Sequence, residues 1–133
     1  LWASPEVARD AYETMYRLAD LVLPTDEDEA LLFGAEEPKQ VVSRLQSFGV
    51  SEVILKMGAK GCLIGTESGM ETVPAEVVKV EDSTAAGDSF NAGFMAARFQ
   101  QRDLKSACGN ANRLASVVIQ HRGAIIPRAA MPY

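Results

Sequence analysis

The sequence is poor in the residues that build metal, disulfide and nucleic-acid sites. Its 133 residues include one histidine, one tryptophan and two cysteines, and 13 basic residues stand against 18 acidic ones. A single histidine cannot form the histidine clusters of metal enzymes, and two widely separated cysteines form neither a disulfide framework nor a zinc spacing. The net charge of −5 argues against a nucleic-acid partner, because phosphate backbones need a basic face.

Several common signatures are missing as well. No apolar run approaches the roughly 18 residues that cross a membrane, and no secretory leader precedes the first helix signal. We therefore expect no membrane partner, and we expect Cys62 and Cys108 to be buried free thiols of a cytoplasmic protein. There is no Gly-Lys pair for a Walker loop, and Gly58 and Gly61 supply only two of the three glycines of a dinucleotide fingerprint. The first residue is Leu rather than Met, so we expect a part of a longer chain.

Gly87-Asp88-Ser89 is similar to the nucleophile block of one class of esterases. That chemistry needs a histidine with an aspartate three positions before it, but Val118 holds that position relative to His121. The hydrolase elbow Gly-x-Ser-x-Gly is also absent, since Asn91 replaces the second glycine. We expect Ser89 to be a first-turn helix residue, with the esterase as the minor alternative.

Short apolar runs alternate with amphipathic segments along the chain. The Ser4-Pro5-Glu6 start signal and the apolar spacing predict a helix over residues 5–19. The same reasoning predicts further helices over 26–33, 38–48, 90–99 and 104–120, and strands over 21–23, 53–55, 62–64, 70–73 and 77–80. This alternation indicates an α/β layer structure with a mostly parallel sheet.

The segment Ala85-Ala86-Gly87-Asp88 lies where a strand gives way to a helix. Small residues there allow a ligand to approach the backbone, and a helix start offers unpaired N–H groups with partial positive charge. Such a place suits a transferring phosphoryl group, and an aspartate in it can accept a proton from an attacking hydroxyl. The alternative is that Asp88 only caps the helix.

Residues 82–94, Asp-Ser-Thr-Ala-Ala-Gly-Asp-Ser-Phe-Asn-Ala-Gly-Phe, resemble the D-T-x-G-A-G-D-x-F signature of the ribokinase-like (PfkB) carbohydrate kinases. The resemblance implies a three-layer α/β/α fold, with Asp88 as the catalytic base that also contacts the sugar. It implies that the amides of Ala85, Ala86 and Gly87 form an anion hole for the γ-phosphate of ATP. Ala85 departs from the family, which has glycine there, and the added methyl group restricts φ.

Other segments resemble the family's nucleotide site. Residues 55–61, Leu-Lys-Met-Gly-Ala-Lys-Gly, are similar to a K-x-G-x-x-G stretch, and the Asn112 region is similar to the adenine-side helix. The resemblance implies that ATP contacts a set of five residues: Lys56, Gly58, Ala59, Gly61 and Asn112. Taken alone, the two glycines are equally consistent with hairpin turns.

Residues 24–34 resemble the segment of the family's N-x-x-E motif, which organises Mg²⁺ and phosphate. Spacing puts Thr25 at the Asn and Asp28 at the Glu, whereas Glu29-Ala30 fits the flanking pattern better. Either Asp28 or Glu29 is therefore expected to serve the metal indirectly, and a solvated acidic helix start is the alternative.

The two ends narrow the resemblance to one branch. Leu1-Trp2 with Ser4, and residues 123–127, Gly-Ala-Ile-Ile-Pro, resemble the bacterial enzymes that phosphorylate 2-keto-3-deoxygluconate at its C6 hydroxyl. The resemblance implies that residues 1–133 are the C-terminal, nucleotide-binding portion, with the N-terminal portion and lid absent, and that the full-length protein is a homo-oligomer. The alternatives are another PfkB-type sugar kinase, such as a fructokinase, or a non-catalytic nucleotide-binding fragment.

Overall fold

The computed structural model of the chain describes residues 2–132, so Leu1 of the expected N-terminal resemblance lies outside the described residues. The chain divides into two compact units. Unit 1 contains the residues up to Met57 together with Leu63–Thr72, and unit 2 contains Gly58–Cys62 together with the residues from Val73 onward. Each unit is described by itself.

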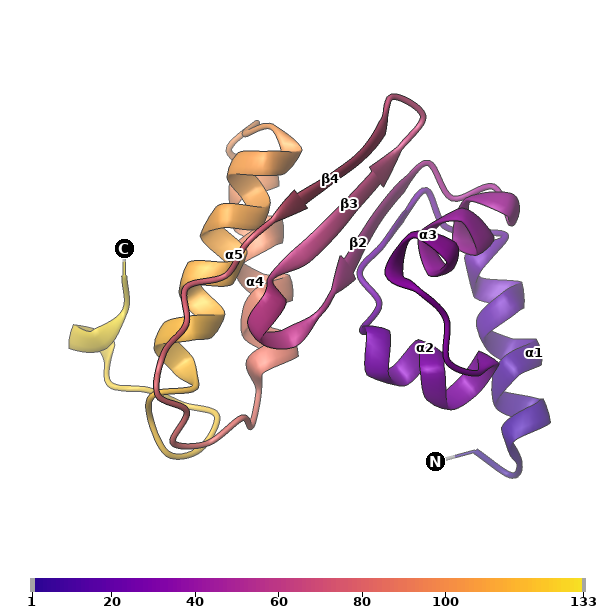
Figure 1. The fold of residues 1–133 in the computed structure, drawn as a ribbon. Coiled ribbons are helices and arrows are strands. Elements are labelled where there is room, and N and C mark those ends of the chain that lie inside the picture. Colours follow the sequence, from indigo (N-terminus) through magenta and orange to yellow (C-terminus); the bar gives the residue numbers. More distant parts are fainter. Residues whose placement is uncertain (1, 133) are drawn as a thin grey trace. The chain divides into compact units, whose positions relative to one another are not determined.

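Unit 1 alternates helices and strands, as the sequence predicts (Figure 1). In chain order its elements are α1 (Pro5–Tyr16), β1 (Leu21–Val22), α2 (Asp26–Phe33), α3 (Pro38–Ser47) and β2 (Glu52–Lys56). The start of α1 is the predicted one, because the Ser4 side chain accepts a hydrogen bond from the N–H of Val7 at 3.3 Å. Four acidic residues fill the first turn of α2, where the helix dipole favours negative charge.

The sheet has the strand order β1-β2-β3-β4, with β3 at Cys62–Thr66 and β4 at Gly69–Val73. β1 and β2 are parallel, with Leu21 opposite Glu52 and Val22 opposite Val53. The connections from β2 to β3 and from β3 to β4 are too short for a crossover, so these strands run antiparallel (Figure 1). Parallel pairing is therefore confined to β1 and β2 within the described sheet.

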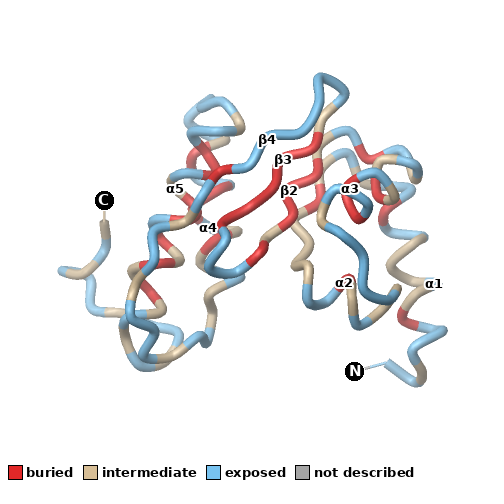
Figure 2. The backbone as a smooth tube through the Cα atoms, in the orientation of Figure 1, coloured by how far each residue is buried: buried red, intermediate tan, exposed pale blue. Residues whose placement is uncertain are grey.

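The core of unit 1 lies between the sheet and its helices. β2 and β3 are buried along most of their length, whereas β4 is largely exposed (Figure 2). The side chains of the buried cluster come from α1, α3, the strands and the residues on either side of β2: Tyr16, Val22, Val41, Val42, Leu45, Val50, Val53, Leu55, Met57 and Leu63. The apolar spacing predicted for residues 41–48 is confirmed, because Val41, Val42 and Leu45 of α3 all face this cluster.

Unit 2 contains the helices α4 (Ala86–Phe99) and α5 (Leu104–Val118) and a short 3₁₀ turn at Arg128–Ala130. The two long helices cross closely at Gly93, where a Cβ atom would lie 3.1 Å from the Cα of Ala111. Phe90 and Phe94 are buried on one face of α4, but Phe99 is 80% exposed, so the apolar surface of this helix is only partly covered within the described residues.

The prediction of a strand over residues 77–80 is wrong. This segment has no regular structure, and Val77 and Val80 are 84% and 54% exposed. Among the described residues these valines have no neighbouring strand with which to pair, and a strand forms only by pairing. Within residues 2–132 there is also no helix with the length and apolar character needed to cross a membrane.

Candidate functional site

The start of α4 has the backbone that a glycine would normally adopt. Ala85, the N-cap residue, is left-handed with φ 61° and ψ 16°. A left-handed L-residue costs about 1–2 kcal/mol, so the surrounding structure must hold it there. The alanine in place of the family's glycine therefore leaves the glycine-like conformation intact.

This turn leaves backbone donors free at the start of α4. The N–H of Ala86 donates to the carbonyl of Ser83 at 3.1 Å, and that of Ser89 donates to the carbonyl of Ala85 at 2.9 Å. Between them, the N–H groups of Gly87 and Asp88 find no acceptor among the described residues. Free N–H groups at a helix N-terminus attract an anion such as a phosphate.

Asp88 lies in the first turn of α4 and is exposed. No described residue donates a hydrogen bond to its carboxylate, so the oxygens are free to accept a proton or a hydrogen bond from a ligand. Ser89 follows it as a first-turn residue of the helix, as predicted. The structure thus joins a free carboxylate and two free N–H groups on one helical turn.

Asp82 fastens the segment before α4 to the loop after α5. One carboxylate oxygen accepts from the N–H of Thr84 at 2.9 Å, and the other accepts from the N–H of Gly123 at 2.8 Å. The backbone N–H of Glu81 also donates to the carbonyl of Ile119, at 2.8 Å. Hydrogen bonds from Thr84 and then from Gly123 lower the pKa of Asp82 to about 2. This carboxylate is therefore ionised at neutral pH and holds the turn that presents Asp88.

Gly61, one of the expected nucleotide residues, has a steric role in unit 2. It is buried with φ +87°, and a Cβ atom there would overlap the carbonyl oxygen of Val73 and lie 2.6 Å from the nitrogen of Ala75. Only glycine allows this approach. Gly58 and Ala59, by contrast, are exposed in a short 3₁₀ turn at Gly58–Lys60, where their backbone is open to a ligand.

Asn112 contacts the same segment as Gly61. Its side-chain Nδ2 donates to the carbonyl oxygens of Val73 and Pro74, each at 3.2 Å, and the residue is only 7% exposed. Ser116, one turn further along α5, reaches the carbonyl of Glu76 at 3.5 Å. The structure therefore places Gly61 and Asn112 together, both against the chain that leaves β4. The adenine contact of Asn112 remains a prediction.

Two other expected residues, Lys56 and Asp28, line one groove in unit 1. This β1 groove, about 320 Å³ in volume, runs between the second half of α1 and the strand β1 and ends at Thr25, Asp28 and Lys56. Thr25 and Lys56 are bridged residues at the carboxyl ends of β1 and β2. Ligands of open α/β sheets bind at the carboxyl ends of parallel strands, so this end of the groove is a candidate phosphate or metal position.

Asp28 and Glu29 have different environments. Asp28 is exposed, whereas Glu29 is 1% exposed and holds α1, α2 and α3 together. One Glu29 oxygen accepts from the Tyr16 hydroxyl and the other from Arg44 Nη2 at 3.0 Å. Burial, and then the Glu29 hydrogen bond, raise the pKa of Tyr16. Both Glu29 oxygens are thus engaged within the fold, which favours Asp28 for contact with a metal.

The carboxylates near the β1 groove could bind Mg²⁺ only together with substrate phosphates, as in phosphate-transfer sites. No group of three or more His, Cys, Asp or Glu side chains in the described part of the chain is placed to hold a metal. Mg²⁺ in such sites keeps several waters and is bound through one or two carboxylates plus substrate phosphates. A single exposed carboxylate such as Asp28 fits that mode.

The sequence analysis did not identify Asp82 and Arg44 as residues that join separate segments of the fold. The bond from the Thr84 N–H to Asp82 is an Asx turn, which the Asp-Ser-Thr sequence was a signal for. Arg44 had no such signal, because its partners Glu29 and Glu36 come from other parts of the chain. Cys62 and Cys108 are free and buried, as predicted.

Known proteins resemble the chain over nearly its whole length. The sequence model described as pfkB family carbohydrate kinase matches residues 1–131. The chain is 43% identical over 136 residues to the 2-dehydro-3-deoxygluconokinase of Escherichia coli K12, with 99% of this chain and 44% of that protein covered. It therefore spans less than half the length of that relative.

Solved structures agree with this result. A fructokinase from Vibrio cholerae, bound to fructose, ADP and calcium, superposes with a TM-score of 0.84 at 26% identity and covers 92% of this chain and 42% of its own. A putative ribokinase II from Escherichia coli, in complex with ATP and Mg²⁺, has a TM-score of 0.79 at 29% identity and covers 90% and 39%. The expected ribokinase-like α/β fold is thus confirmed, and the chain belongs to the pfkB family of carbohydrate kinases.

Proposed function

We propose that this chain is the nucleotide-binding portion of a cytoplasmic kinase that transfers the γ-phosphoryl group of ATP to the C6 hydroxyl of 2-keto-3-deoxygluconate. The observation that carries the proposal is the start of α4, where the exposed Asp88 and the free N–H groups of Gly87 and Asp88 share one turn. The sugar is inferred from the 43% identity to a 2-dehydro-3-deoxygluconokinase.

Different residues are proposed to stabilise the phosphoryl group, to accept the proton and to bind the metal. The N–H groups of Gly87 and Asp88 stabilise the negative charge that develops on the transferred phosphoryl group, with Ala85 and Ala86 forming the turn that presents them. The Asp88 carboxylate accepts the proton of the C6 hydroxyl as that oxygen attacks phosphorus in line. Mg²⁺, when bound, neutralises phosphate charge. Asp28 contributes a carboxylate to it, and Glu29 fixes the helix that carries Asp28.

Other residues are proposed to bind the rest of the nucleotide. We assign Lys56 to its phosphates, the exposed backbone of Gly58 and Ala59 to its ribose side, and Gly61 and Asn112 to the shape of the surrounding wall. Gly61 and Asn112 also position the segment after β4, and we keep both as proposed nucleotide contacts, with Asn112 on the adenine side. We also propose that the full-length protein is a homo-oligomer.

The test is ADP release with 2-keto-3-deoxygluconate, fructose and ribose as acceptors, using the complete reading frame that contains this chain. Turnover with 2-keto-3-deoxygluconate alone supports the proposal. Preference for fructose or ribose would show a sugar kinase with a different substrate. ATP binding by calorimetry without turnover would indicate a non-catalytic nucleotide-binding protein.

A matched pair of variants tests the base. Asp88→Asn is expected to bind ATP normally and to lose about 10²-fold or more in kcat, the range of general-base catalysis. Glu6→Gln removes a first-turn acid from α1 instead and is expected to leave kcat unchanged. Near-normal kcat in Asp88→Asn would remove Asp88 from its role.

A further inference from the structure

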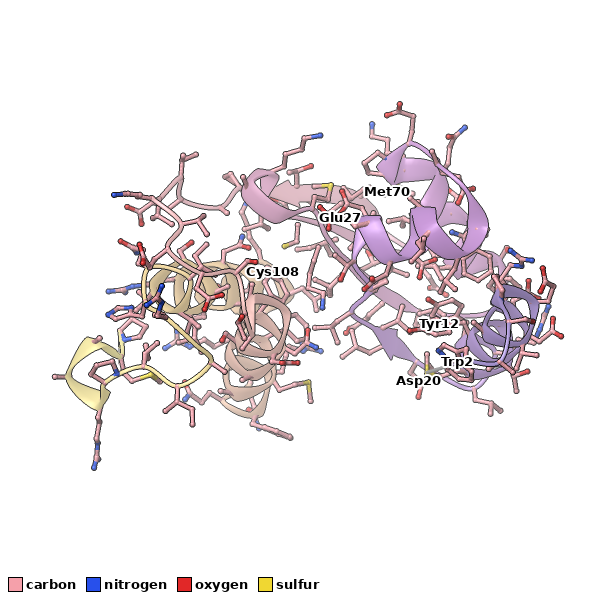
Figure 3. All side chains as sticks on the ribbon, turned by 90° about the horizontal axis from the view of Figure 1, so that it is seen from below. Trp2, Tyr12, Asp20, Glu27, Met70 and Cys108 are labelled. Carbon is pink, nitrogen blue, oxygen red and sulfur yellow. The ribbon has the colours of Figure 1, made fainter. Side chains whose placement is uncertain are left out.

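A second groove lies between α4 and α5 of unit 2. This α4–α5 groove has a volume of about 310 Å³, and its lining includes Gly93, Ala96, Ala97, Gln100, Arg102 and Arg113. Arg113 reaches it from the exposed side of α5, whereas Cys108 (labelled in Figure 3) and Asn112 lie on the buried side of that helix. Within residues 2–132 no aspartate or glutamate lines the groove, so its charged side chains are both positive.

The two arginines of the groove are exposed and unpaired. Neither Arg102 nor Arg113 forms an ion pair or donates a side-chain hydrogen bond to another described residue. Arg9, Arg17 and Arg44, by contrast, each pair with a glutamate. A guanidinium presents its N–H groups as a fixed fork that matches the oxygens of a phosphate or carboxylate. An oxyanion can therefore bind both arginines of the groove without breaking an existing contact.

The end of α4 fixes the backbone of Arg102. Gln101 is left-handed with φ 59°, and the N–H of Arg102 donates to the carbonyl of Ala97 at 3.1 Å. The N–H of Gln101 donates to the carbonyl of Arg98 at 2.9 Å, which completes a Schellman motif. Arg98 Nη1 also donates to the carbonyl of Arg102 at 3.2 Å. The last carbonyls of α4, which would otherwise repel an anion, are thereby hydrogen-bonded.

The close crossing of the two helices brings Arg113 to the same groove. A Cβ atom at Gly93 would lie 3.1 Å from the Cα of Ala111, so α5 approaches the α4 backbone closely. The α4 side of the groove also includes Ala96 and Ala97, whose side chains are small. Two cationic groups from different helices therefore share one space that has room for the body of a small ligand.

The charge of the sequence changes sign around this groove. After Asp88 the sequence has one acidic residue, Asp103, and six basic ones: Arg98, Arg102, Lys105, Arg113, Arg122 and Arg128. The Asp103 carboxylate caps α5, where it accepts hydrogen bonds from the N–H and the hydroxyl of Ser106 at 2.9 and 2.8 Å. Basic residues that gather in one part of a chain whose net charge is −5 attract anions to that part.

We propose that the α4–α5 groove binds a small organic phosphate ester. The phosphate accepts hydrogen bonds from Arg102 and Arg113, and the carbon skeleton lies against the small residues of α4. A phosphate ester carries a charge of about −1.5 to −2 at pH 7, which matches two guanidinium groups, whereas a carboxylate carries a single charge. Asp88 and Arg102 lie at opposite ends of the 14-residue α4, roughly 20 Å apart along the helix, so this site is separate from the proposed phosphoryl-transfer site.

The test is an NMR titration of the complete protein that contains this chain, followed at the Nε–H signals of its arginines. The signals of Arg102 and Arg113 are identified by their loss in Arg102→Gln and Arg113→Gln. The probes are glucose 6-phosphate, gluconate and glucose, which have six carbons each but carry a phosphate, a carboxylate and no charge. We expect only glucose 6-phosphate to shift both signals. This readout is independent of kinase activity, so its failure is distinguishable from failure of the proposed function.

Each variant also measures binding at the arginine that remains. In Arg102→Gln, the Arg113 signal should need at least tenfold more glucose 6-phosphate for half of its shift, and the Arg102 signal should behave likewise in Arg113→Gln. Arg128→Gln changes an exposed arginine outside the groove lining and should leave the titration unchanged. Signals that do not move would overturn the proposal, and so would an equal loss of affinity in Arg128→Gln, which would indicate a diffuse charge effect. Gluconate that shifts both signals at the same concentration as glucose 6-phosphate would also overturn it, because the groove would then be a carboxylate site.

Discussion

The carboxylate of Asp82 accepts a hydrogen bond from the N–H of Gly123, 2.8 Å away and 41 residues later in the sequence. The same carboxylate accepts from Thr84, so it joins the turn before α4 to the loop after α5. Asp88 lies six residues beyond Asp82 in that turn and first helical turn. The position of the proposed base is thus set by an ionised side chain that does not itself belong to the helix.

The first prediction concerns the pH dependence of this link. The folded pKa of Asp82, about 2, lies below its ordinary 3.8. A group with a depressed folded pKa stabilises the fold above its unfolded pKa, and that stabilisation is lost as the pH falls toward the folded value. Asp82→Asn should therefore be less stable than the wild type at pH 7, and the difference should shrink between pH 4 and pH 2.

Urea unfolding at a series of pH values measures this difference. Asp10→Asn, at an exposed acid of α1, is the control variant and is measured at the same pH values. A difference for Asp82→Asn that does not change with pH would show that the Asp82 charge is not what joins the two segments.

The second prediction concerns the left-handed Ala85. Replacing it with glycine relieves about 1–2 kcal/mol of backbone strain but adds about 0.5–1 kcal/mol of lost chain entropy. Ala85→Gly is therefore expected to stabilise the fold by up to about 1.5 kcal/mol, measured by urea unfolding. Ala86→Gly, one position inside α4, should destabilise it by about 0.5–1 kcal/mol. Lower stability in Ala85→Gly than in Ala86→Gly would contradict the left-handed turn.

The sequence predicted the elements that carry local signals. The α2 bounds were predicted correctly because acids precede its apolar residues and Gly34, with φ +94°, ends it. The segment at residues 77–80, Val-Val-Lys-Val, is apolar like the other predicted strands, yet it forms no strand. An apolar run indicates residues suited to burial, but a strand also needs a partner edge, which no local pattern supplies.

In the candidate site, too, features with a local sequence signal could be predicted and features that depend on packing could not. The helix start at residues 85–88 could be predicted because small residues and an aspartate at a helix start have a direct physical meaning. The environments of Asp28 and Glu29 could not, because adjacent residues on a helix differ in burial according to which elements pack against them. Only the fold shows that Arg44 and Tyr16 reach Glu29.

The third prediction separates the two glycines of the K-x-G-x-x-G stretch. Gly61→Ala puts a methyl group onto the backbone of Val73 and Ala75 and should cost about 3 kcal/mol or more. Gly58 also has a positive φ, +54°, but nothing lies within 4 Å of its Cβ position, so Gly58→Ala should cost only about 1 kcal/mol. Thermal or urea unfolding compares the two. Equal losses would mean that the chain after β4 does not pack against Gly61.

The last prediction separates two adjacent acids. Glu29→Ala removes the partner of Arg44, whose side chain is only 20% exposed, and should cost about 3 kcal/mol in the free energy of unfolding. Asp28→Ala changes an exposed side chain and should alter that free energy by no more than about 0.5 kcal/mol. If Asp28 serves the metal, its variant should instead need more Mg²⁺ for half-maximal ADP release in the complete protein. The opposite result is a Glu29→Ala protein that has wild-type stability but needs more Mg²⁺. It would assign the metal to Glu29 rather than Asp28, because the buried contacts of Glu29 would then be dispensable to the fold.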